Sequence, residues 1–217
     1  MFICIFISEL FVLYLLSQSL TKEISHLLHK FTRNKKITVY LLAFLFLPGT
    51  IIHELSHHLM AELLFVRTGR IHLIPEIIGS EIRMGQAEIE KTDFVRRFSI
   101  GVAPFIVGNI ILFGAVYSSI YYFYADNKLF VLFLLYILFQ TGNTMFASKK
   151  DMEGALVLIV VLACIVIALY LIGFRLNMYE YLTTPLMFTI FRKVSLYLTV
   201  PLIFDGLLLL LLKIINR

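Results

Sequence analysis

The residues best suited to chemistry are five consecutive ones, His53-Glu54-Leu55-Ser56-His57. Residues four apart on an α-helix lie on the same face one turn from each other, so the two imidazoles could share one metal ion. Glu54 is offset by one residue and could instead accept a proton from a water molecule at that ion. This is the chemistry of the H-E-x-x-H pattern of zinc metalloproteases. We therefore expect Zn²⁺ as cofactor, His53 and His57 as its ligands, and Glu54 as general base.

A hydrolytic zinc ion needs a third protein ligand and one open position. The chain has four aspartates. We expect Asp93 to pair at the surface with the nearby arginines, and Asp126 lies in a short turn on the opposite side of the membrane from the end of the segment that carries the histidines. Asp151 follows the fourth apolar segment, on the same side of the membrane as the end of the segment that carries the histidines. Asp205 lies inside the last apolar segment, where an ionisable side chain is costly and usually functional. The remaining acidic candidates are Glu62 and Glu153.

Six apolar segments approach the ~20 residues that a membrane-spanning helix needs. Inside hydrocarbon the backbone must pair within its own segment or in a closed barrel, and these segments are too long and uniformly apolar for barrel strands. We therefore expect an all-α polytopic membrane protein with about six transmembrane helices, forming a single membrane domain over 1–217. The expected segments are 2–20, 37–66, 98–124, 129–147, 155–173 and 194–212.

The segment at 37–66 is longer than one span requires. As a straight helix it would extend ~45 Å at 1.5 Å per residue, whereas the hydrocarbon core is ~30 Å thick. Pro48-Gly49 interrupts this segment just before the histidine motif. Since proline disrupts a helix interior, we expect the segment to bend or break there.

The polar connection at 67–97 has a different pattern. Charged and apolar residues alternate over 81–84 and 87–90, and this period of two is typical of β-strands. Gly79-Ser80 supplies a turn between this run and 71–78. We predict a small β-hairpin at the membrane surface.

Composition points to lipid as the surroundings. The chain is 60% apolar and 15% charged, well above the ~45–50% apolar content of soluble domains. The net charge of +5 is explained by basic loops at anionic lipid head groups, and no basic stripe with aromatics suggests nucleic acid as a partner.

Cys4 and Cys164 both lie in apolar runs, which argues against a disulfide. We interpret the apolar N-terminus as a retained span, not a signal peptide.

These residues resemble the site-2 protease family of intramembrane zinc metalloproteases, the M50 peptidases. That family has HExxH on one helix and a third ligand in a later N-x-x-P-x-x-x-L-D-G segment. Asn143 to Asp151 keeps the Asn-to-Asp spacing of eight, with one full span intervening. The stretch from Gly101 through Pro104 to Asn109 is similar to the family's Gly-Pro…Asn stretch. The resemblance covers about 37–155, the expected catalytic core.

The chain also departs from the family pattern. Phe146, Lys150 and Met152 stand where the family has Pro, Leu and Gly, and the Asp-Gly pair occurs instead at Asp205-Gly206. Spacing and helix count favour Asp151 as third ligand, whereas membrane depth and the Asp-Gly pair favour Asp205. We expect Asp151 and keep Asp205 as the alternative.

The resemblance implies hydrolysis of peptide bonds in membrane-spanning substrate segments, as in regulated proteolysis of membrane-anchored regulators or clearance of signal peptides. Asn143 and Asn109 are candidate substrate-binding residues. Asn143 could hydrogen-bond a substrate backbone or the ligating Asp151, or it could join helices by a hydrogen bond, and Asn109 is a similar case. Two alternatives stay open. One is an M48-type membrane metalloprotease with a glutamate as third ligand. The other is a non-catalytic protein, either a transporter or a pseudo-protease that binds substrate without cutting it.

Overall fold

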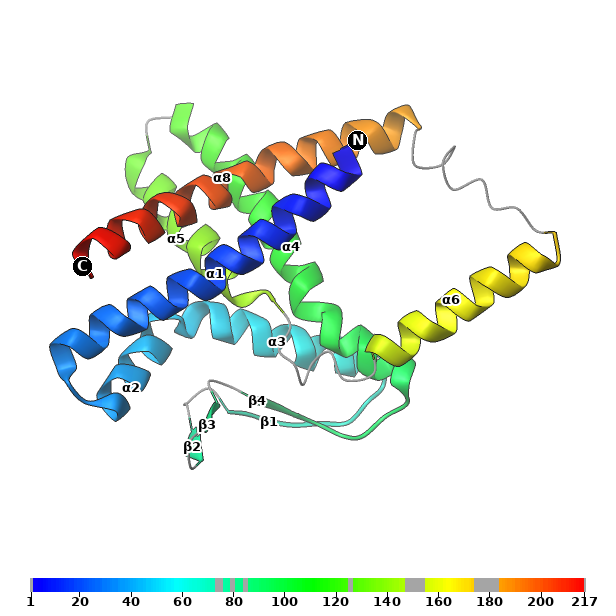
Figure 1. Ribbon diagram of the computed structural model, residues 1–217, viewed down its shortest axis with the longest axis horizontal. Coiled ribbons are helices and arrows are strands. Elements are labelled where there is room, and N and C mark those ends of the chain that lie inside the picture. Colours follow the sequence, from blue (N-terminus) through cyan, green and yellow to red (C-terminus); the bar gives the residue numbers. More distant parts are fainter. Residues whose placement is uncertain are drawn as a thin grey trace.

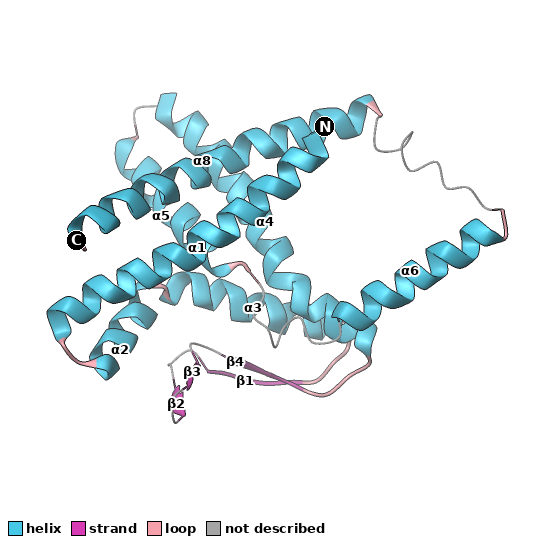
Figure 2. Ribbon diagram, viewed as in Figure 1, coloured by secondary structure: helices cyan, strands magenta, loops and turns pink. Residues whose placement is uncertain are grey.

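The computed structural model describes residues 2–72, 76–78, 81–83, 86–124, 127–146, 155–173 and 184–216. Helices account for most of them, with two small sheets along one edge (Figures 1 and 2). The all-α part of the prediction is therefore confirmed. The helices are α1 (Phe2–Thr32), α2 (Lys35–Leu45), α3 (Leu47–Leu63), α4 (Phe94–Tyr124), α5 (Lys128–Thr144), α6 (Ala155–Leu171) and α8 (Pro185–Ile215).

The described residues do not bear out the predicted number of six spans. Among the described residues, three helices are long and apolar enough to cross a membrane, namely α1, α4 and α8. The bent pair of α2 and α3 would make a fourth if it forms one span. Helices α5 and α6 form where apolar segments were expected, but each has 17 residues. At 1.5 Å per residue their described lengths are about 25 Å, at the lower limit for a membrane-spanning helix.

The directions of the first and last helices also argue against six spans. Near their starts, Phe6 packs on Phe191 with ring centroids 5.8 Å apart. Near their ends, the Asn216 side-chain amide donates a 2.7 Å hydrogen bond to the Glu23 carboxylate. Helices α1 and α8 thus run parallel, as Figure 1 shows. Six segments that each crossed the membrane in turn would make the first and sixth antiparallel, so parallel helices require an odd number of crossings.

The long apolar segment that carries the histidine motif is broken, as expected. Helix α2 ends at Leu45, helix α3 begins at Leu47, and their axes are bent by 68°. Pro48 lies in the first turn of α3, where its missing N–H costs least. The break lies at Phe46, two residues before the proline. It leaves α3 as a separate helix of 17 residues.

The polar connection between α3 and α4 contains the predicted strands. Strand β2 (Glu76–Ile78) pairs antiparallel with β3 (Glu81–Arg83), which encloses the expected turn, although 79–80 lie outside the described residues. Strand β1 (Thr68–His72) pairs antiparallel with β4 (Gln86–Ile89). Ile89 packs beside a small core formed by Ala61 of α3, Val66 and Ile100 of α4. The β-structured loop is therefore anchored next to the helix with the histidines.

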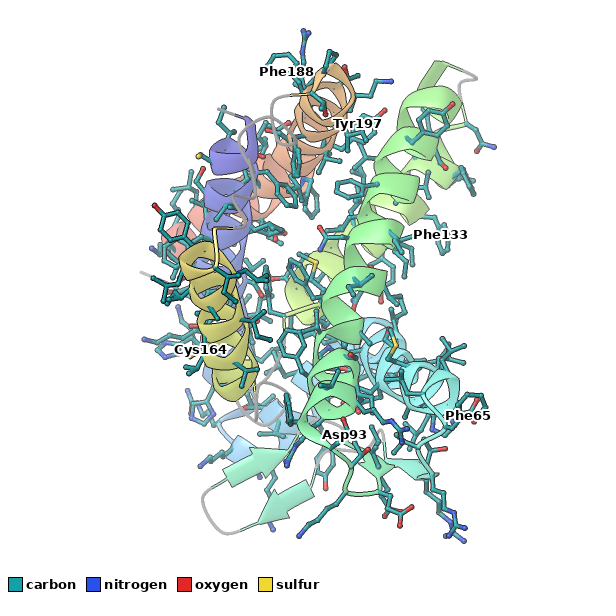
Figure 3. All side chains as sticks on the ribbon, turned by 90° about the vertical axis from the view of Figure 1, so that its right-hand side faces the viewer. Phe65, Asp93, Phe133, Cys164, Phe188 and Tyr197 are labelled. Carbon is teal, nitrogen blue, oxygen red and sulfur yellow. The ribbon has the colours of Figure 1, made fainter. Side chains whose placement is uncertain are left out.

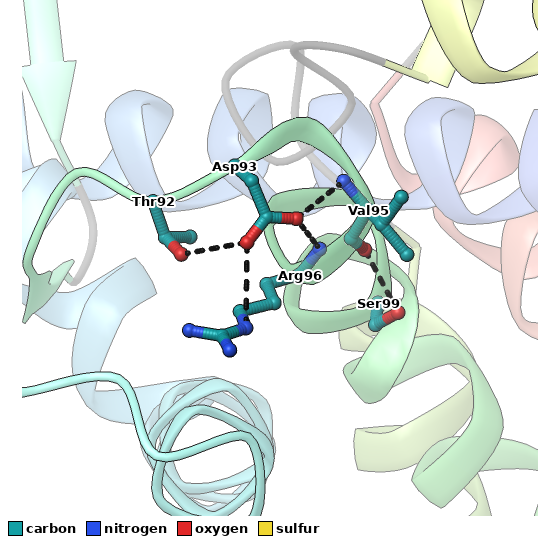
Figure 4. A network of polar contacts seen from close by, with 5 residues as sticks. All are labelled: Thr92, Asp93, Val95, Arg96 and Ser99. Carbon is teal, nitrogen blue, oxygen red and sulfur yellow. Dashed lines mark hydrogen bonds and ion pairs between the residues drawn. The ribbon is translucent and has the colours of Figure 1, made fainter.

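Helix α4 begins with a capping aspartate. The Asp93 carboxylate accepts hydrogen bonds from the backbone N–H groups of Val95 and Arg96, both at 3.1 Å, and lies 3.3 Å from the Arg96 guanidinium (Figure 4). These are donors that a helix N-terminus leaves without partners. They hold the pKa of Asp93 below its usual value, the backbone N–H of Arg96 contributing most. The expected surface pairing of Asp93 is thereby confirmed.

One core cluster joins four helices. Leu13 of α1, Leu112 of α4, Leu138 of α5 and Leu198 of α8 are all buried within it. Many large apolar side chains face outward instead, including Phe11 (61% exposed) and Leu207 (63%). In Figure 3, Phe65 and Asp93 lie at one end of the molecule, and Phe188 and Tyr197 lie toward the other. Long apolar helices with apolar outer faces are the features of a membrane protein.

Candidate metal centre

His53 and His57 face each other on α3. Their Nε2 atoms are 3.2 Å apart, and their rings are nearly perpendicular, at 82°, with centroids 4.8 Å apart. His57 is buried and His53 is half-buried. The expected placement of the two imidazoles on one helix face, one turn apart, is confirmed.

His53 is oriented by the end of another helix. Its Nδ1 lies 2.6 Å from the carbonyl oxygen of Thr144, the last residue of α5. The final four carbonyls of a helix have no partner within that helix, so Thr144 is free to accept. Because a carbonyl can only accept, Nδ1 is the N–H donor.

His57 is oriented by a carbonyl in the middle of a helix. Its Nδ1 lies 2.8 Å from the carbonyl oxygen of Ile100 in α4. In a regular helix that oxygen would accept from the N–H four residues later, but that residue is Pro104, which has no N–H. Pro104 thus leaves the Ile100 carbonyl available to the imidazole, and Nδ1 of His57 is again the donor.

With both Nδ1 atoms donating, two Nε2 atoms with lone pairs point at each other. At 3.2 Å this arrangement is favourable only with a cation, a proton or a metal ion, between them. Two nitrogen ligands of a tetrahedral zinc ion, each at ~2.0–2.1 Å, would be about 3.3 Å apart. Histidines that bind metals also characteristically donate their other N–H to a carbonyl or carboxylate. The observed pair therefore fits two zinc ligands.

Only some of the acidic residues considered as ligands lie within the described part of the chain. Glu54 is buried on α3 between the two histidines in sequence, with 8% of its surface exposed. The predicted third ligand, Asp151, lies outside the described residues, as does Glu153. Glu62 instead pairs with His58, at 3.2 Å. In the described part of the chain, no group of three or more His, Cys, Asp or Glu side chains is arranged to hold a metal ion.

Asp205, the alternative ligand, forms a hydrogen bond with Asn143, a residue next to the histidine site. It is fully buried on α8, and its Oδ2 accepts a 3.2 Å hydrogen bond from the Asn143 amide. Asn143 directly precedes Thr144, whose carbonyl orients His53. Asp205 is therefore joined to the site through α5, and it does not form a three-ligand group with the two histidines among the residues described.

The two predicted substrate-binding asparagines use their amide hydrogens within the protein. Asn143 donates to the Phe139 carbonyl at 2.8 Å as well as to Asp205, and Asn109 donates to the Phe105 carbonyl at 2.8 Å. The Oδ1 atom of each is buried and has no hydrogen-bond partner within the described residues. Each oxygen could accept from a substrate N–H, and that role stays a prediction.

Sequence reasoning missed three residues that contact α3 or its histidines, which are Ile100, Gln140 and Thr144. Ile100 could have been found, because a proline four residues later always removes the donor for its carbonyl. Gln140 is a polar residue in an apolar segment, which is a weaker signal. Thr144 gives no signal of its own, since its backbone and not its side chain meets His53.

Comparison with known proteins found no match to this chain among protein-family models, curated proteins or solved structures.

Proposed function

We propose that this chain is a multi-pass integral membrane protein that acts as a zinc-dependent endopeptidase on membrane-spanning substrate segments. One observation carries the proposal: the Nε2 atoms of His53 and His57 converge to 3.2 Å while each Nδ1 is held by a main-chain carbonyl. The HExxH spacing and the resemblance to site-2 proteases support the reaction and the substrate class. The three long apolar helices support the membrane location.

Each residue of the site has a distinct role in this proposal. His53, His57 and Asp151 hold the metal, with Asp205 as the alternative third ligand. When bound, zinc supplies a Lewis acid that makes water a nucleophile near neutral pH. Glu54 accepts the proton as water attacks the scissile carbonyl, and then delivers that proton to the departing amine nitrogen. Asn143 and Asn109 accept hydrogen bonds from the substrate backbone.

The burial of Glu54 suits this role. Electrostatic interactions are stronger where water is excluded, so a carboxylate in such a site interacts more strongly with charge that develops at the reacting atoms than one at the surface. The substrate must also be locally unwound, because the backbone amides of an intact helix are already paired and surround the scissile carbonyl.

The test uses the full chain in lipid nanodiscs, with metal content measured by mass spectrometry and cleavage measured on a membrane-spanning peptide. The parent protein is expected to carry one zinc ion per chain and to cleave the peptide. Glu54→Gln should keep the zinc and lose ~10²–10⁴-fold in kcat, because it removes only the proton acceptor. His53→Ala should lose both zinc and cleavage.

His58→Ala is the matched control, because His58 lies on the same helix and pairs with Glu62 instead of facing the site. It should keep zinc and activity. A Glu54→Gln variant as active as the parent would end the protease proposal. Stoichiometric zinc without cleavage would identify a binding protein, and a parent protein that binds no zinc would favour the transporter.

A further inference from the structure

The side chain of Gln140 is completely buried at the break between α2 and α3. It lies in the last turns of α5, and its carboxamide makes two hydrogen bonds across to the other segment. Nε2 donates to the carbonyl oxygen of Leu45 at 2.6 Å, and Oε1 accepts from the backbone N–H of Gly49 at 3.3 Å.

Leu45 and Gly49 are four residues apart, so in a continuous helix this N–H would donate to this carbonyl directly. The Gln140 carboxamide is inserted into that one hydrogen bond and satisfies both of its ends. On either side of the break helical bonds are made, with Phe46 N to Leu42 O at 3.0 Å and Thr50 N to Phe46 O at 2.9 Å, whereas Pro48 has no N–H to donate to the Phe44 carbonyl. A side chain inserted into the i to i−4 series is a physical cause of a sharp helix bend.

The same turns of α5 hold α3 at two further points. The Thr144 carbonyl accepts from His53. Gly49 lies so close to α5 that an added Cβ would be 2.5 Å from the Thr144 hydroxyl oxygen and 2.8 Å from the Gln140 carbonyl oxygen. The start of α3 and the first histidine are therefore both fixed against the segment 140–144.

We propose that Gln140 is a positioning residue for the metal site: by occupying the opened Leu45–Gly49 hydrogen bond, it sets the bend between α2 and α3 and so keeps the histidine motif against α5. The effect on zinc rests on the proposed function, whereas the effect on the bend does not. Pro48 alone would give a shallower kink, because Gly49 could then bond to Leu45 again.

The bend can be measured with two spin labels on the full chain in nanodiscs. Exposed positions on the two arms are Ile37 and Leu63, each changed to Cys in a protein whose Cys4 and Cys164 are changed to Ser. Gln140→Leu keeps the volume but removes both hydrogen-bonding groups. From the helix rise, straightening should lengthen the distance between the labels by about 5 Å. Zinc affinity should fall roughly 10–100-fold, as it does when residues that orient metal ligands are substituted.

Gln140→Glu supplies a readout that a loss of packing alone would not give. A protonated carboxyl group has one donor and one acceptor, like the amide, whereas the ionised form has no donor. The label distance in this variant should match the parent at acid pH and lengthen at alkaline pH, while the parent distance stays constant. Gln18→Leu is the matched control, because Gln18 is exposed on α1 and bonds only to Tyr14 among the hydrogen bonds described.

An unchanged distance in Gln140→Leu would overturn the assignment of the bend to Gln140. A longer distance with unchanged zinc affinity would overturn its role at the metal site. If the Leu variant does not fold, a pH-independent distance in Gln140→Glu overturns the proposal by itself. A parent protein that binds zinc but cleaves nothing would remove the proposed activity and leave both of these results valid.

Discussion

At the scale of single residues, the candidate metal site depends on backbone carbonyls that have lost their helical partners. Thr144 is free because α5 ends there, and Ile100 is free because Pro104 lacks an N–H. Each carbonyl takes the Nδ1 proton of one histidine and so turns the other ring nitrogen toward its neighbour. Two main-chain carbonyls thus orient the histidines so that their Nε2 atoms converge.

Pro104→Ala tests this arrangement. The alanine N–H could donate to the Ile100 carbonyl and would compete with His57, so zinc affinity should fall roughly 10–100-fold while the helical content of α4 stays unchanged or rises. Zinc competition with a chelator measures the affinity, and circular dichroism measures the helix content.

Pro201→Ala is the control, since Pro201 is also inside a helix, α8, and its preceding turn contacts neither histidine in the hydrogen bonds described. It should leave zinc affinity within a factor of about two of the parent. Equal losses in the two variants would show that the proline matters for helix shape alone.

At the scale of secondary-structure elements, helix ends do most of the positioning. The end of α5 meets His53 and the break between α2 and α3, and the start of α4 is fixed by Asp93. Helix α4 in turn carries the Ile100 carbonyl, seven residues after its capping aspartate. Stability of the α4 N-terminus should therefore depend on the charge of Asp93.

The pH dependence of this cap has a definite sign. The pKa of Asp93 in the folded protein is lowered from 3.8 by the backbone N–H of Arg96 and then by the Arg96 charge. The stabilisation is thus fully present above pH 3.8 and is lost as pH falls through the lower, folded-state pKa. Thermal unfolding in detergent, measured from neutral to acid pH, should show the parent losing more stability than Asp93→Asn.

Asparagine is the informative variant because it can still accept the backbone hydrogen bonds but carries no charge. At neutral pH, it should unfold at a slightly lower temperature than the parent, and the two should converge in acid. Parallel pH profiles for parent and variant would show that the Asp93 charge does not stabilise α4.

At the scale of the whole molecule, the parallel course of α1 and α8 determines which segments share a side of the membrane. Lys30 near the end of α1 donates to the Ile215 carbonyl near the end of α8 at 3.4 Å. If both helices cross the bilayer, their C-terminal ends emerge together. The six alternating spans expected from the apolar segments would place them on opposite sides.

Cysteine labelling distinguishes the two arrangements. In a protein without Cys4 and Cys164, the exposed residues Lys35 and Lys213 are each changed to Cys, and Thr184 is changed to Cys at the other end of α8. A membrane-impermeant maleimide should label the first two from one side and the third from the opposite side. Labelling of Lys35→Cys and Lys213→Cys from opposite sides would contradict the parallel arrangement.

The sequence by itself determined many of the elements and the placement of the two histidines. Apolar runs predicted helices, alternation over 81–84 and 87–90 predicted strands, Pro48 indicated the break, and the spacing of His53 and His57 put both rings on one helix face. These features depend on residues close together in the chain, so local periodicity and backbone constraints are sufficient to predict them.

Only the tertiary structure decided how the elements meet. The contact of His53 with Thr144 joins residues 91 apart in the chain, that of Gln140 with Leu45 joins residues 95 apart, and that of Asn143 with Asp205 joins residues 62 apart. Hydropathy records that a segment is apolar but neither its direction nor whether it crosses the membrane completely. For this reason six apolar segments were expected to span, whereas three helices, or up to four, qualify among the described residues. The carbonyls that orient the histidines are backbone groups common to every residue. Pro104 marks the Ile100 carbonyl as lacking its helical donor, but only the packing of α3 against α4 and α5 decides that the Ile100 and Thr144 carbonyls meet the histidines.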